Sequence, residues 1–345
     1  MPIETPSPLT TAVEALAAGR SLGAEAVRLA VGSILDGAAG DVETAAFLTA
    51  LAVKGETGEE LLGAVQAVRE RMIAFESGRE GCIDNCGTGG DGSRSVNVST
   101  GAAVVVAACG VPVVKHGNRA ASGRSGSSDV LQELGVAIDV DPAVQRRGLD
   151  ELGVAFLFAP RFHPGLRGAA PIRRKLPFRT VFNLVGPLCN PASPSFQLVG
   201  VPVEAHAWRM AEVLSRTSTI RRAVVVRGLD GLDEVTLADR TEVLVVEDGR
   251  IDRLTWSPAD LGLPETGTRG LIVDGPLQSA NMLRATFEGE GGPTRAYILA
   301  NAAAAIWTAE GGDLRAAVAR AAEALDSGRA VAILNRWGAI GREAS

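Results

Sequence analysis

The sequence has few of the residues that mark a metalloprotein of the zinc type. It contains only four cysteines and three histidines in 345 residues, and no two cysteines form a CxxC pair. A zinc site is therefore not expected, and buried free thiols in a reducing compartment are the simplest interpretation of the cysteines.

The chain also lacks the segments that direct a protein to export or to a membrane. The opening residues, MPIETPSPLT, have neither the basic start nor the apolar centre of a signal peptide. The longest nearly apolar run, residues 101–114, is too short to span a bilayer. The net charge of −6 argues against a general nucleic-acid or membrane-surface role. We therefore expect a cytoplasmic protein that binds neither membranes nor nucleic acids.

Acidic residues are missing from two long stretches. No Asp or Glu lies between Asp91 and Asp129, although four basic residues do, and none lies between Glu151 and Glu204. A carboxylate 4 Å from a phosphate would cost roughly 4 kcal/mol at an effective dielectric constant near 20, so an anion site should lack carboxylates. The six basic residues within 161–179 form either a solvated surface or a second surface that faces an anion, called here the anion-facing wall. We favour the anion-facing wall.

Glycine is abundant where the first of these stretches begins. Four of the six residues 87–92 are glycine, although the loop matches neither GxxxxGK[ST] nor GxGxxG. Glycine lets backbone N–H groups turn toward a ligand, and a helix that starts near Ser99 or Thr100 would add its own unpaired N–H groups. The loop therefore predicts a phosphate cradle, with a plain glycine turn as the alternative.

The hydrophobic pattern changes once along the chain. Residues 10–76 have helical periodicity, with Ser21 and Asp41 as expected helix caps and capping-box spacing from Thr57 to Glu60. After Gly81, short apolar runs alternate with helical stretches, which is typical of a mostly parallel sheet flanked by helices. The predicted strands cover residues 111–114, 136–140, 154–159, 198–201, 223–226 and 243–246. We predict an α/β protein with a small N-terminal helical domain at 1–76, joined by helices around 165–190, and a large α/β domain at 77–345.

An acidic segment follows one of the predicted strands. Residues 229–234 contain Asp230, Asp233 and Glu234, beyond the carboxyl end of a strand, where open α/β sheets bind ligands. Hard oxygen ligands that face a polyphosphate suit Mg²⁺, and a plain acidic turn is the alternative.

Several motifs, taken in order, closely resemble the anthranilate phosphoribosyltransferase family over nearly the whole chain. They are GTGGD at 87–91, NVST at 97–100, KHGNR at 115–119, His163-Pro164, NLVGPL at 183–188, and Asp233-Glu234. The resemblance implies a helical domain joined to an α/β domain with a mixed sheet, and a homodimer formed through the helical domains. It also implies Mg²⁺-dependent transfer of phosphoribose from phosphoribosyl pyrophosphate to the amine of anthranilate, in tryptophan biosynthesis.

The resemblance also assigns site residues. The substrates would be bound by Gly87, Thr88, Gly90, Asp91, Ser95, Asn97, Val98, Ser99, Thr100, Lys115, His116, Gly117, Asn118, Arg119, Gly123, Ser127, His163, Arg173, Gly186 and Pro187. Ser99 would ligate one Mg²⁺, and Asp233 and Glu234 would organise a second. Three of the residues would have catalytic roles. Lys115 would take up charge on the leaving pyrophosphate, Arg173 would pair with the anthranilate carboxylate, and His116 would accept a proton or orient a substrate.

The chain departs from the family pattern at a few positions. Gly123 stands where the family often has a serine that contacts the 5′-phosphate, Ser95-Val96 replaces a more usual Thr-Phe pair, and Gly165 replaces alanine. The first change would weaken a phosphate contact unless backbone N–H groups serve instead.

Two other functions stay open on the sequence. One is a pyrimidine nucleoside phosphorylase of the same fold, which would need a different glycine loop and no Asp-Glu pair. The other is a non-catalytic, phosphate-binding regulatory protein, although the expected metal ligands and Arg173 are all present.

Overall fold

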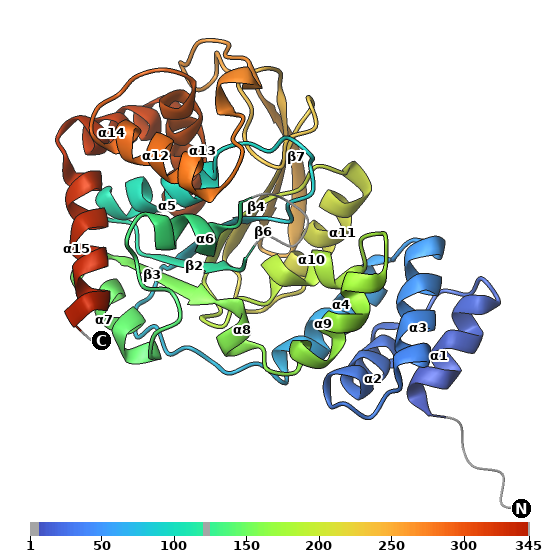
Figure 1. Ribbon diagram of the computed structural model, residues 1–345. Helices are drawn as coiled ribbons and strands as arrows, with labels where there is room; N and C mark the ends of the chain where they lie inside the picture. Colours follow the sequence, from blue (N-terminus) through green and yellow to red (C-terminus); the bar gives the residue numbers. More distant parts are fainter. Residues whose placement is uncertain (1–6, 120–124, 344–345) are drawn as a thin grey trace, which may run out of the picture. The chain divides into compact units, whose positions relative to one another are not determined.

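The computed structural model of the protein describes residues 7–119 and 125–343, so the predicted phosphate contact Gly123 lies outside the described residues. The chain divides into two compact units (Figure 1). Met1–Ala74 with Pro160–Pro191 form one, called here the helical unit, and Phe75–Ala159 with Ala192–Ser345 form the other, the α/β unit. Within the described residues, no helix combines the length and the apolar character needed to cross a bilayer.

The helical unit is built from amphipathic helices. They are α1 (Pro8–Ala17), α2 (Ala24–Leu35), α3 (Asp41–Lys54), α4 (Gly58–Arg69), α9 (Leu166–Lys175) and α10 (Val181–Leu188). The short helix α8 (Ala159–Phe162) comes directly before α9 in the chain. Helix α10 packs against α3 and α4, and α9 packs against α2 and α3. Phe47, Leu51 and Leu61 are fully buried between these helices and form the core of the unit.

The predicted capping box at the start of α4 is confirmed. The Thr57 N–H donates to Glu60 Oε2 at 2.7 Å, and the Glu60 N–H donates to Thr57 Oγ1 at 3.2 Å. The buried Glu60 carboxylate also accepts from the Leu22 N–H at 2.9 Å and pairs with Lys54 at 2.8 Å. Glu60 therefore ties three segments of the helical unit together.

The two other predicted caps are wrong. Ser21 does not cap α2, which begins after Gly23, because the Leu22 N–H is bound by Glu60 and the backbone stays extended to Gly23. Asp41 is the first residue of α3 rather than its cap, and the N–H of Gly40 before it donates to Glu43 at 3.3 Å.

The α/β unit contains one sheet of seven strands within the described residues. The strands are β1 (Ile83–Gly87), β2 (Val113–Gly117), β3 (Val154–Phe158), β4 (Phe196–Gly200), β5 (Arg222–Gly228), β6 (Thr241–Glu247) and β7 (Arg250–Trp256). Their order is β3-β2-β1-β4-β5-β6-β7, with β1 to β5 parallel and β6 and β7 antiparallel. The prediction of a mostly parallel sheet is confirmed.

The predicted strand at 136–140 is wrong, and two strands were not predicted. Val136 and Ile138 are buried in the core, but they lie in a loop between two helices. Strand β1 was missed because its second and third residues, Asp84 and Asn85, are polar although buried. Strand β7 was missed because charged, exposed residues dominate it.

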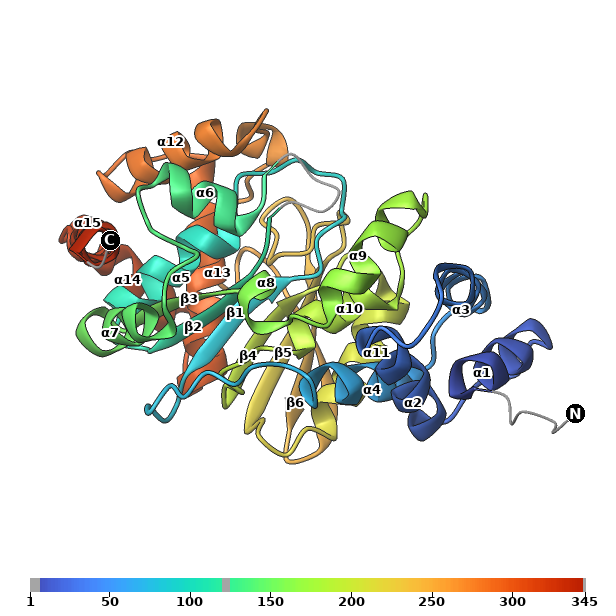
Figure 2. The same cartoon turned by 60° about the horizontal axis from the view of Figure 1, so that its bottom comes forward.

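Helices cover both faces of the sheet. They are α5 (Val98–Ala108), α6 (Ser127–Glu133), α7 (Pro142–Leu152), α11 (Glu204–Ser215), α12 (Pro276–Phe287), α13 (Pro293–Glu310), α14 (Leu314–Asp326) and α15 (Arg329–Glu343), with the 3₁₀ helix η1 (Thr268–Leu271) before α12. Helix α13 packs against α5, β4 and β5, whereas α11 packs against β5, β6 and β7. Figure 2 shows α5 and α13 on one side of the sheet and α11 on the other.

The centre of the sheet is the point where the strand order reverses. From β1 the chain passes through α5 to β2 on one side, and from β4 it passes through α11 to β5 on the other. Loops that leave neighbouring parallel strands in opposite directions open a crevice at the carboxyl ends of those strands, which is where open α/β sheets bind ligands. The glycine loop 87–92 begins at this crevice.

Candidate active site

The acidic segment 229–234 lies directly over the ends of β1 and β4. Gly87 and Gly200 are paired in register on these two strands. A Cβ at Gly87 would stand 2.4 Å from Asp233 Oδ2, and one at Gly200 would stand 1.6 Å from the Asp233 carbonyl oxygen. Two glycines therefore make the room in which Asp233 reaches the glycine loop.

The adjacent carboxylates Asp233 and Glu234 bind near the two ends of residues 87–99, called here the glycine-rich stretch. The Gly89 N–H donates to Asp233 Oδ2 at 2.7 Å, and the Ser99 N–H donates to Glu234 Oε1 at 3.2 Å. Both bonds reach the same segment because residues 229–234 follow β5 as an irregular loop rather than as a strand or helix. The third carboxylate, Asp230, serves the turn itself, since it accepts from the Thr236 hydroxyl at 2.8 Å.

These carboxylates are held in a setting that disfavours their ionised forms. Burial and the nearby Asp91 carboxylate raise the pKa of Asp233 to about 7. Burial and the Asp233 carboxylate raise the pKa of Glu234 to about 8, although the Lys115 ammonium opposes the shift. A divalent cation beside the pair would relieve this repulsion.

The donor atoms around the pair fit Mg²⁺ bound together with a substrate. The oxygens of Asp233, Glu234, Asp91 and Ser99 are all hard ligands, which Mg²⁺ prefers. Among the described residues, no three His, Cys, Asp or Glu side chains already enclose a metal position. This arrangement matches the ordinary mode of Mg²⁺, which uses one or two carboxylates, water and substrate phosphates rather than a cage of protein ligands.

A buried ammonium group lies beneath the start of α5. Lys115, at the third position of β2, donates from Nζ to the Asn85 carbonyl oxygen and to Ser99 Oγ, the latter at 3.3 Å. The Asn85 side chain donates in turn to the Ser99 carbonyl oxygen at 2.8 Å. Helix α5 starts at Val98, close to the predicted residue, so its N-terminal N–H groups and the lysine charge occur at the same place.

The second half of the glycine-rich stretch, residues 94–97, pairs with residues 271–273, the segment before α12. Ser95 and Ile272 form an antiparallel bridge, the Val96 N–H donates to the Leu271 carbonyl oxygen at 2.7 Å, and the Val273 N–H donates to the Arg94 carbonyl oxygen at 2.9 Å. Asn97 follows as the N-cap residue of α5. Val98 and Thr100 are buried in the first turn of that helix.

The first half of the glycine-rich stretch, residues 87–92, contains its glycines. Thr88 donates its N–H to the Gly200 carbonyl oxygen at 2.9 Å, and Asp91 accepts from the Ser93 N–H at 3.0 Å. Gly89, Gly90 and Gly92 all have positive φ, a backbone conformation that glycine adopts without steric cost. The conformation of this turn therefore explains why its residues are glycine.

The KHGNR motif ends β2 and turns toward α6. The buried His116 donates its backbone N–H to the buried Asp84 at 3.2 Å. A side chain at Gly117 would clash with Ser127 Oγ and with the Phe156 ring, from which its Cβ would stand 2.7 Å away. The next two residues are joined locally, since Asn118 Oδ1 accepts from the Arg119 N–H at 2.8 Å.

Arg119 is already paired. Its guanidinium lies 2.9 Å from Asp129 and 5.8 Å above the ring of Phe158. A substrate would have to compete with Asp129 for it, so a direct role in substrate binding is the weakest of the assignments in this motif.

The remaining predicted residues belong to the helical unit. His163 is buried, and burial lowers its pKa to about 4, so the ring is neutral at pH 7. The Arg173 guanidinium lies 5.2 Å from the centre of the Phe182 ring, and burial lowers its pKa from the ordinary value. Gly186 and Pro187 lie near the end of α10, and a Cβ at Gly186 would meet no atom within 4 Å.

The basic run 161–179 is spread over α8, α9 and the segment before α10, and its six residues differ in exposure. Arg167, Arg174 and Lys175 are exposed, whereas Arg161, Arg173 and Arg179 are half-buried. The predicted anion-facing wall is therefore narrower than the run of charges suggests, and one of its half-buried members, Arg173, stacks on the Phe182 ring.

Sequence reasoning missed several residues of the α/β unit that hold the site in place. Asp84 and Asn85 support His116 and Ser99, and the signal was present as two polar residues within a buried strand. Ser125 and Ser279 bind the side chain of Asn97, and no pattern in the sequence distinguishes them from other serines.

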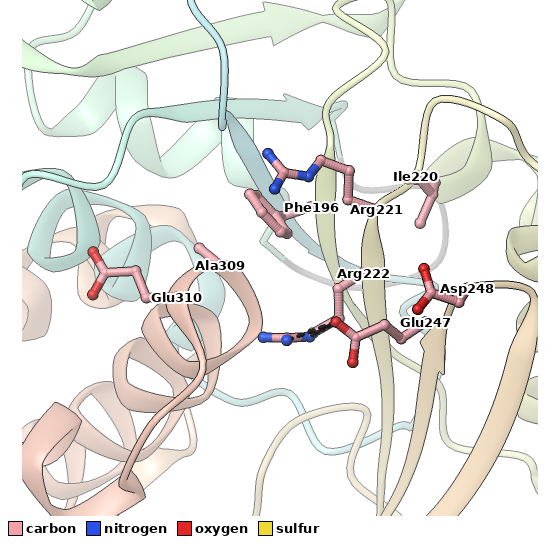
Figure 3. A pocket seen from close by; sticks show the side chains of 8 residues that line it. All are labelled: Phe196, Ile220, Arg221, Arg222, Glu247, Asp248, Ala309 and Glu310. Carbon is pink, nitrogen blue, oxygen red and sulfur yellow. Dashed lines mark hydrogen bonds and ion pairs between the residues drawn. The ribbon is translucent and has the colours of Figure 1, made fainter.

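One cavity of about 440 Å³ lies at the opposite edge of the sheet (Figure 3). Phe196 and Arg222 line it and begin β4 and β5, whereas the glycine loop follows the last residue of β1. Arg222 pairs there with Glu247 at 2.7 Å, and the other lining residues include exposed charges of both signs. The cavity is therefore separate from the site built around Asp233.

A crevice at the strand-order reversal, with a glycine loop and an acidic pair over it, suits a phosphorylated substrate bound together with a divalent cation. The chain matches the model of the glycosyl transferase family, a/b domain, over residues 79–331, and the helical bundle domain of the same family over residues 10–72. The predicted fold class, a small helical domain with a larger α/β domain, is thereby confirmed.

Named relatives narrow the class. The chain is 46% identical to an anthranilate phosphoribosyltransferase of Novosphingobium aromaticivorans, over 89% of this chain and 93% of the relative. It superimposes with a TM-score of 0.88 on the enzyme of that name from Thermus thermophilus, at 38% identity over 96% of this chain and 99% of that one. The enzyme of Saccharomyces cerevisiae, solved in complex with PRPP and Mg, gives the same TM-score at 26% identity, over 97% and 98% of the chains. The protein belongs to the anthranilate phosphoribosyltransferase family.

Proposed function

We propose that the protein transfers the 5-phosphoribosyl group of phosphoribosyl pyrophosphate (PRPP) to the amine of anthranilate, releasing pyrophosphate, in tryptophan biosynthesis. The protein is a pentosyltransferase. The observation that carries the proposal is the grip of Asp233 and Glu234 on the two ends of the glycine-rich stretch, at the reversal of strand order. The identity to enzymes of this name supports it further.

The donor is bound by groups of the α/β unit. The phosphate oxygens lie toward the N-terminus of α5, where the positive end of the helix dipole favours negative charge. Lys115 is placed beneath Ser99 and provides a fixed positive charge. A fixed charge of this kind stabilises negative charge that develops on the departing pyrophosphate.

Ser99, Asp233 and Glu234 would hold Mg²⁺, and we propose two ions for each site. Bound Mg²⁺ supplies positive charge that neutralises the pyrophosphate leaving group. The yeast relative solved with PRPP and Mg supports the binding of Mg²⁺ with this donor.

Arg173 and the residues near it bind anthranilate. The planar guanidinium can form two parallel hydrogen bonds with a carboxylate, and its position above Phe182 fixes its plane. His163 is neutral at pH 7, so it lines the path of the aromatic ring without adding charge. An aromatic amine is largely unprotonated at neutral pH, so positioning it against C1 of the ribose provides much of the acceleration, and His116 orients it or accepts its proton later.

The outer face of α3 supports the proposal of a homodimer through the helical domains. Val42 and Val53, on one face of this helix, are 81% and 82% exposed, and Ala46 and Thr49 continue the stripe between them. The spacing of four, three and four residues is that of a helix-packing seam. Replacing both valines with glutamate should convert the protein to a monomer in sedimentation, and an unchanged mass of the variant would refute this interface.

The cytoplasm is the proposed location. All four cysteines are free thiols, which suits a reducing compartment.

Loss of anthranilate fluorescence tests the activity directly. We expect the signal to fall only when PRPP and Mg²⁺ are both present, with pyrophosphate released in equal amount. A flat signal together with phosphorolysis of uridine or thymidine would identify a nucleoside phosphorylase instead. A flat signal with binding of PRPP and no turnover would identify a regulatory protein.

A further inference from the structure

Asn97 stands at the N-cap of α5, but its side chain does not cap the helix. An asparagine at this position ordinarily accepts an N–H of the first turn with its side-chain oxygen. Here Oδ1 accepts instead from the Ser125 hydroxyl at 2.7 Å and from the Ser279 hydroxyl at 3.0 Å. Two hydroxyl groups thus turn the amide away from the helix that it begins.

Ser279 fixes both the backbone and the side chain of Asn97. It lies fully buried in the first turns of α12, and its Oγ also accepts the Asn97 backbone N–H at 3.0 Å. The hydroxyl donates its single hydrogen to Asn97 Oδ1, and the other end of the amide faces the Ser125 carbonyl oxygen, which can only accept, so that end carries the nitrogen. The Asn97 Nδ2 donates one hydrogen to the Ser125 carbonyl oxygen at 3.2 Å, and one N–H is left for a ligand.

The first N–H groups of α5 have partners other than the Asn97 side chain, since the Val98 N–H donates to the Val96 carbonyl oxygen at 2.7 Å and the Thr100 N–H to the Asn97 carbonyl oxygen at 3.0 Å. The Ser99 N–H is bound by Glu234, not by Asn97. If the amide could turn back, its Oδ1 would compete with Glu234 for the N–H groups of the first turn. The helix would gain an ordinary side-chain cap, the bond from the Ser99 N–H to Glu234 would be weakened, and the site would lose the Nδ2–H donor.

We propose that Ser279 is a positioning residue for the phosphoribosyl donor. Its hydroxyl holds the Asn97 amide so that one Nδ2–H serves the donor's phosphate oxygens and the Ser99 N–H stays bonded to Glu234. The inference rests on the proposed function, in that PRPP is taken as the ligand of this site.

The test compares two hydroxyls of the same helix. Ser279→Ala removes the one that binds Asn97, while Thr286→Val removes another buried hydroxyl, which donates to the Met282 carbonyl oxygen of its own helix. PRPP binding is measured calorimetrically in the presence of Mg²⁺, together with KM for each substrate and the melting temperature. We expect Ser279→Ala to raise Kd and KM for PRPP about tenfold, as the loss of one hydrogen bond to a charged group does. KM for anthranilate should not change, and Thr286→Val should match the wild type in both.

Two further variants sharpen the result. Ser279→Thr retains the hydroxyl and should restore most of the PRPP affinity. In an Asn97→Ala background, adding Ser279→Ala should have no further effect on PRPP binding, because the group that it positions is absent. The melting temperature of Ser279→Ala should stay close to that of Thr286→Val, since the released amide can cap α5.

Several outcomes would overturn the inference. They are PRPP binding by Ser279→Ala within twofold of the wild type, equal losses in Ser279→Ala and Thr286→Val, or a parallel rise in KM for both substrates. The proposed function is judged separately, by the wild-type enzyme alone. A wild type that binds PRPP but does not consume anthranilate would contradict that function while leaving the comparison of binding constants in force.

Discussion

The residues assigned to the donor and those assigned to the acceptor are held by opposite kinds of interaction. In the α/β unit, Asp233, Glu234 and Lys115 are joined to the glycine loop and to α5 by hydrogen bonds and charge. In the helical unit, His163 and Arg173 lie in surroundings whose burial lowers the pKa of each. A diphosphate needs many N–H groups and cations, whereas a small aromatic acid needs one guanidinium and apolar walls. The four predictions below test this contrast.

The largest effect is expected at the acidic pair. Replacing both Asp233 and Glu234 with alanine should lower turnover by roughly a thousandfold or more at ordinary Mg²⁺, because the loop loses its anchors and the proposed metal its ligands. Steady-state rates measure the loss, and Asp239→Ala, an exposed acidic residue in the same connection, is the matched control. Normal rates in the double variant would show that 229–234 is only an acidic turn.

A smaller and more selective effect is expected at Arg173. Arg173→Ala should raise KM for anthranilate by about 10- to 100-fold, the worth of a charge-assisted hydrogen bond, and leave KM for PRPP nearly unchanged. The adjacent, exposed Arg174→Ala should change neither constant. Equal rises in both KM values for Arg173→Ala would contradict the assignment of anthranilate to the helical unit and of PRPP to the α/β unit.

The stability of the metal-free protein should depend on pH in a defined direction. The pKa of Asp233 is about 7 and that of Glu234 about 8, both above the ordinary values. The folded state therefore binds more protons than the unfolded state between about pH 4 and pH 8, and stability is lost as the pH rises through that window. Asp233→Asn should melt several degrees higher than the wild type at pH 8 in EDTA, and the difference should disappear near pH 4.

Added Mg²⁺ completes this experiment. It should raise the melting temperature of the wild type more at pH 8 than at pH 6, and it should have little effect on Asp233→Asn. A stabilisation by Mg²⁺ that is equal in the two proteins would separate the metal from Asp233.

The smallest effect is expected in the helical unit, at the capping box of α4. Thr57→Ala should lower the free energy of unfolding by about 1 kcal/mol, because the Glu60 N–H loses its acceptor. Urea denaturation measures the change. KM for PRPP should be unaffected, and a change in it would mean that stability of the helical unit and donor binding are linked.

The architecture was largely accessible from the sequence because its local signals agree with the fold. The capping box at Thr57 and the apolar runs of β2 to β6 mark elements whose residues suit their structure. The signals failed where tertiary contacts decide the outcome. Strand β1 carries Asp84 and Asn85 in its buried interior because they bind the neighbouring β2 and α5, and Ser21 is displaced as a cap by the reach of Glu60.

The candidate site was accessible only as far as its motifs extend. The glycine loop and the acidic pair could be assigned from their residues and from resemblance, and the structure places them against each other. The position of Ser279 could not be predicted, because it lies 182 residues from Asn97 and its hydroxyl is ordinary until the fold buries it there. Contacts of this range follow from topology and not from any local pattern.

The paired glycines Gly87 and Gly200 set the height of the acidic segment above the sheet. Neither has the positive φ that would demand glycine, so only the missing methyl groups are at issue. An alanine at either position would keep its strand conformation, but its methyl group would push the 229–234 loop away from the sheet. The position of the Asp233 carboxylate would then change without the loss of any polar group. The distance between the sheet and the Asp233 carboxylate therefore depends on two residues that have no side-chain atoms of their own.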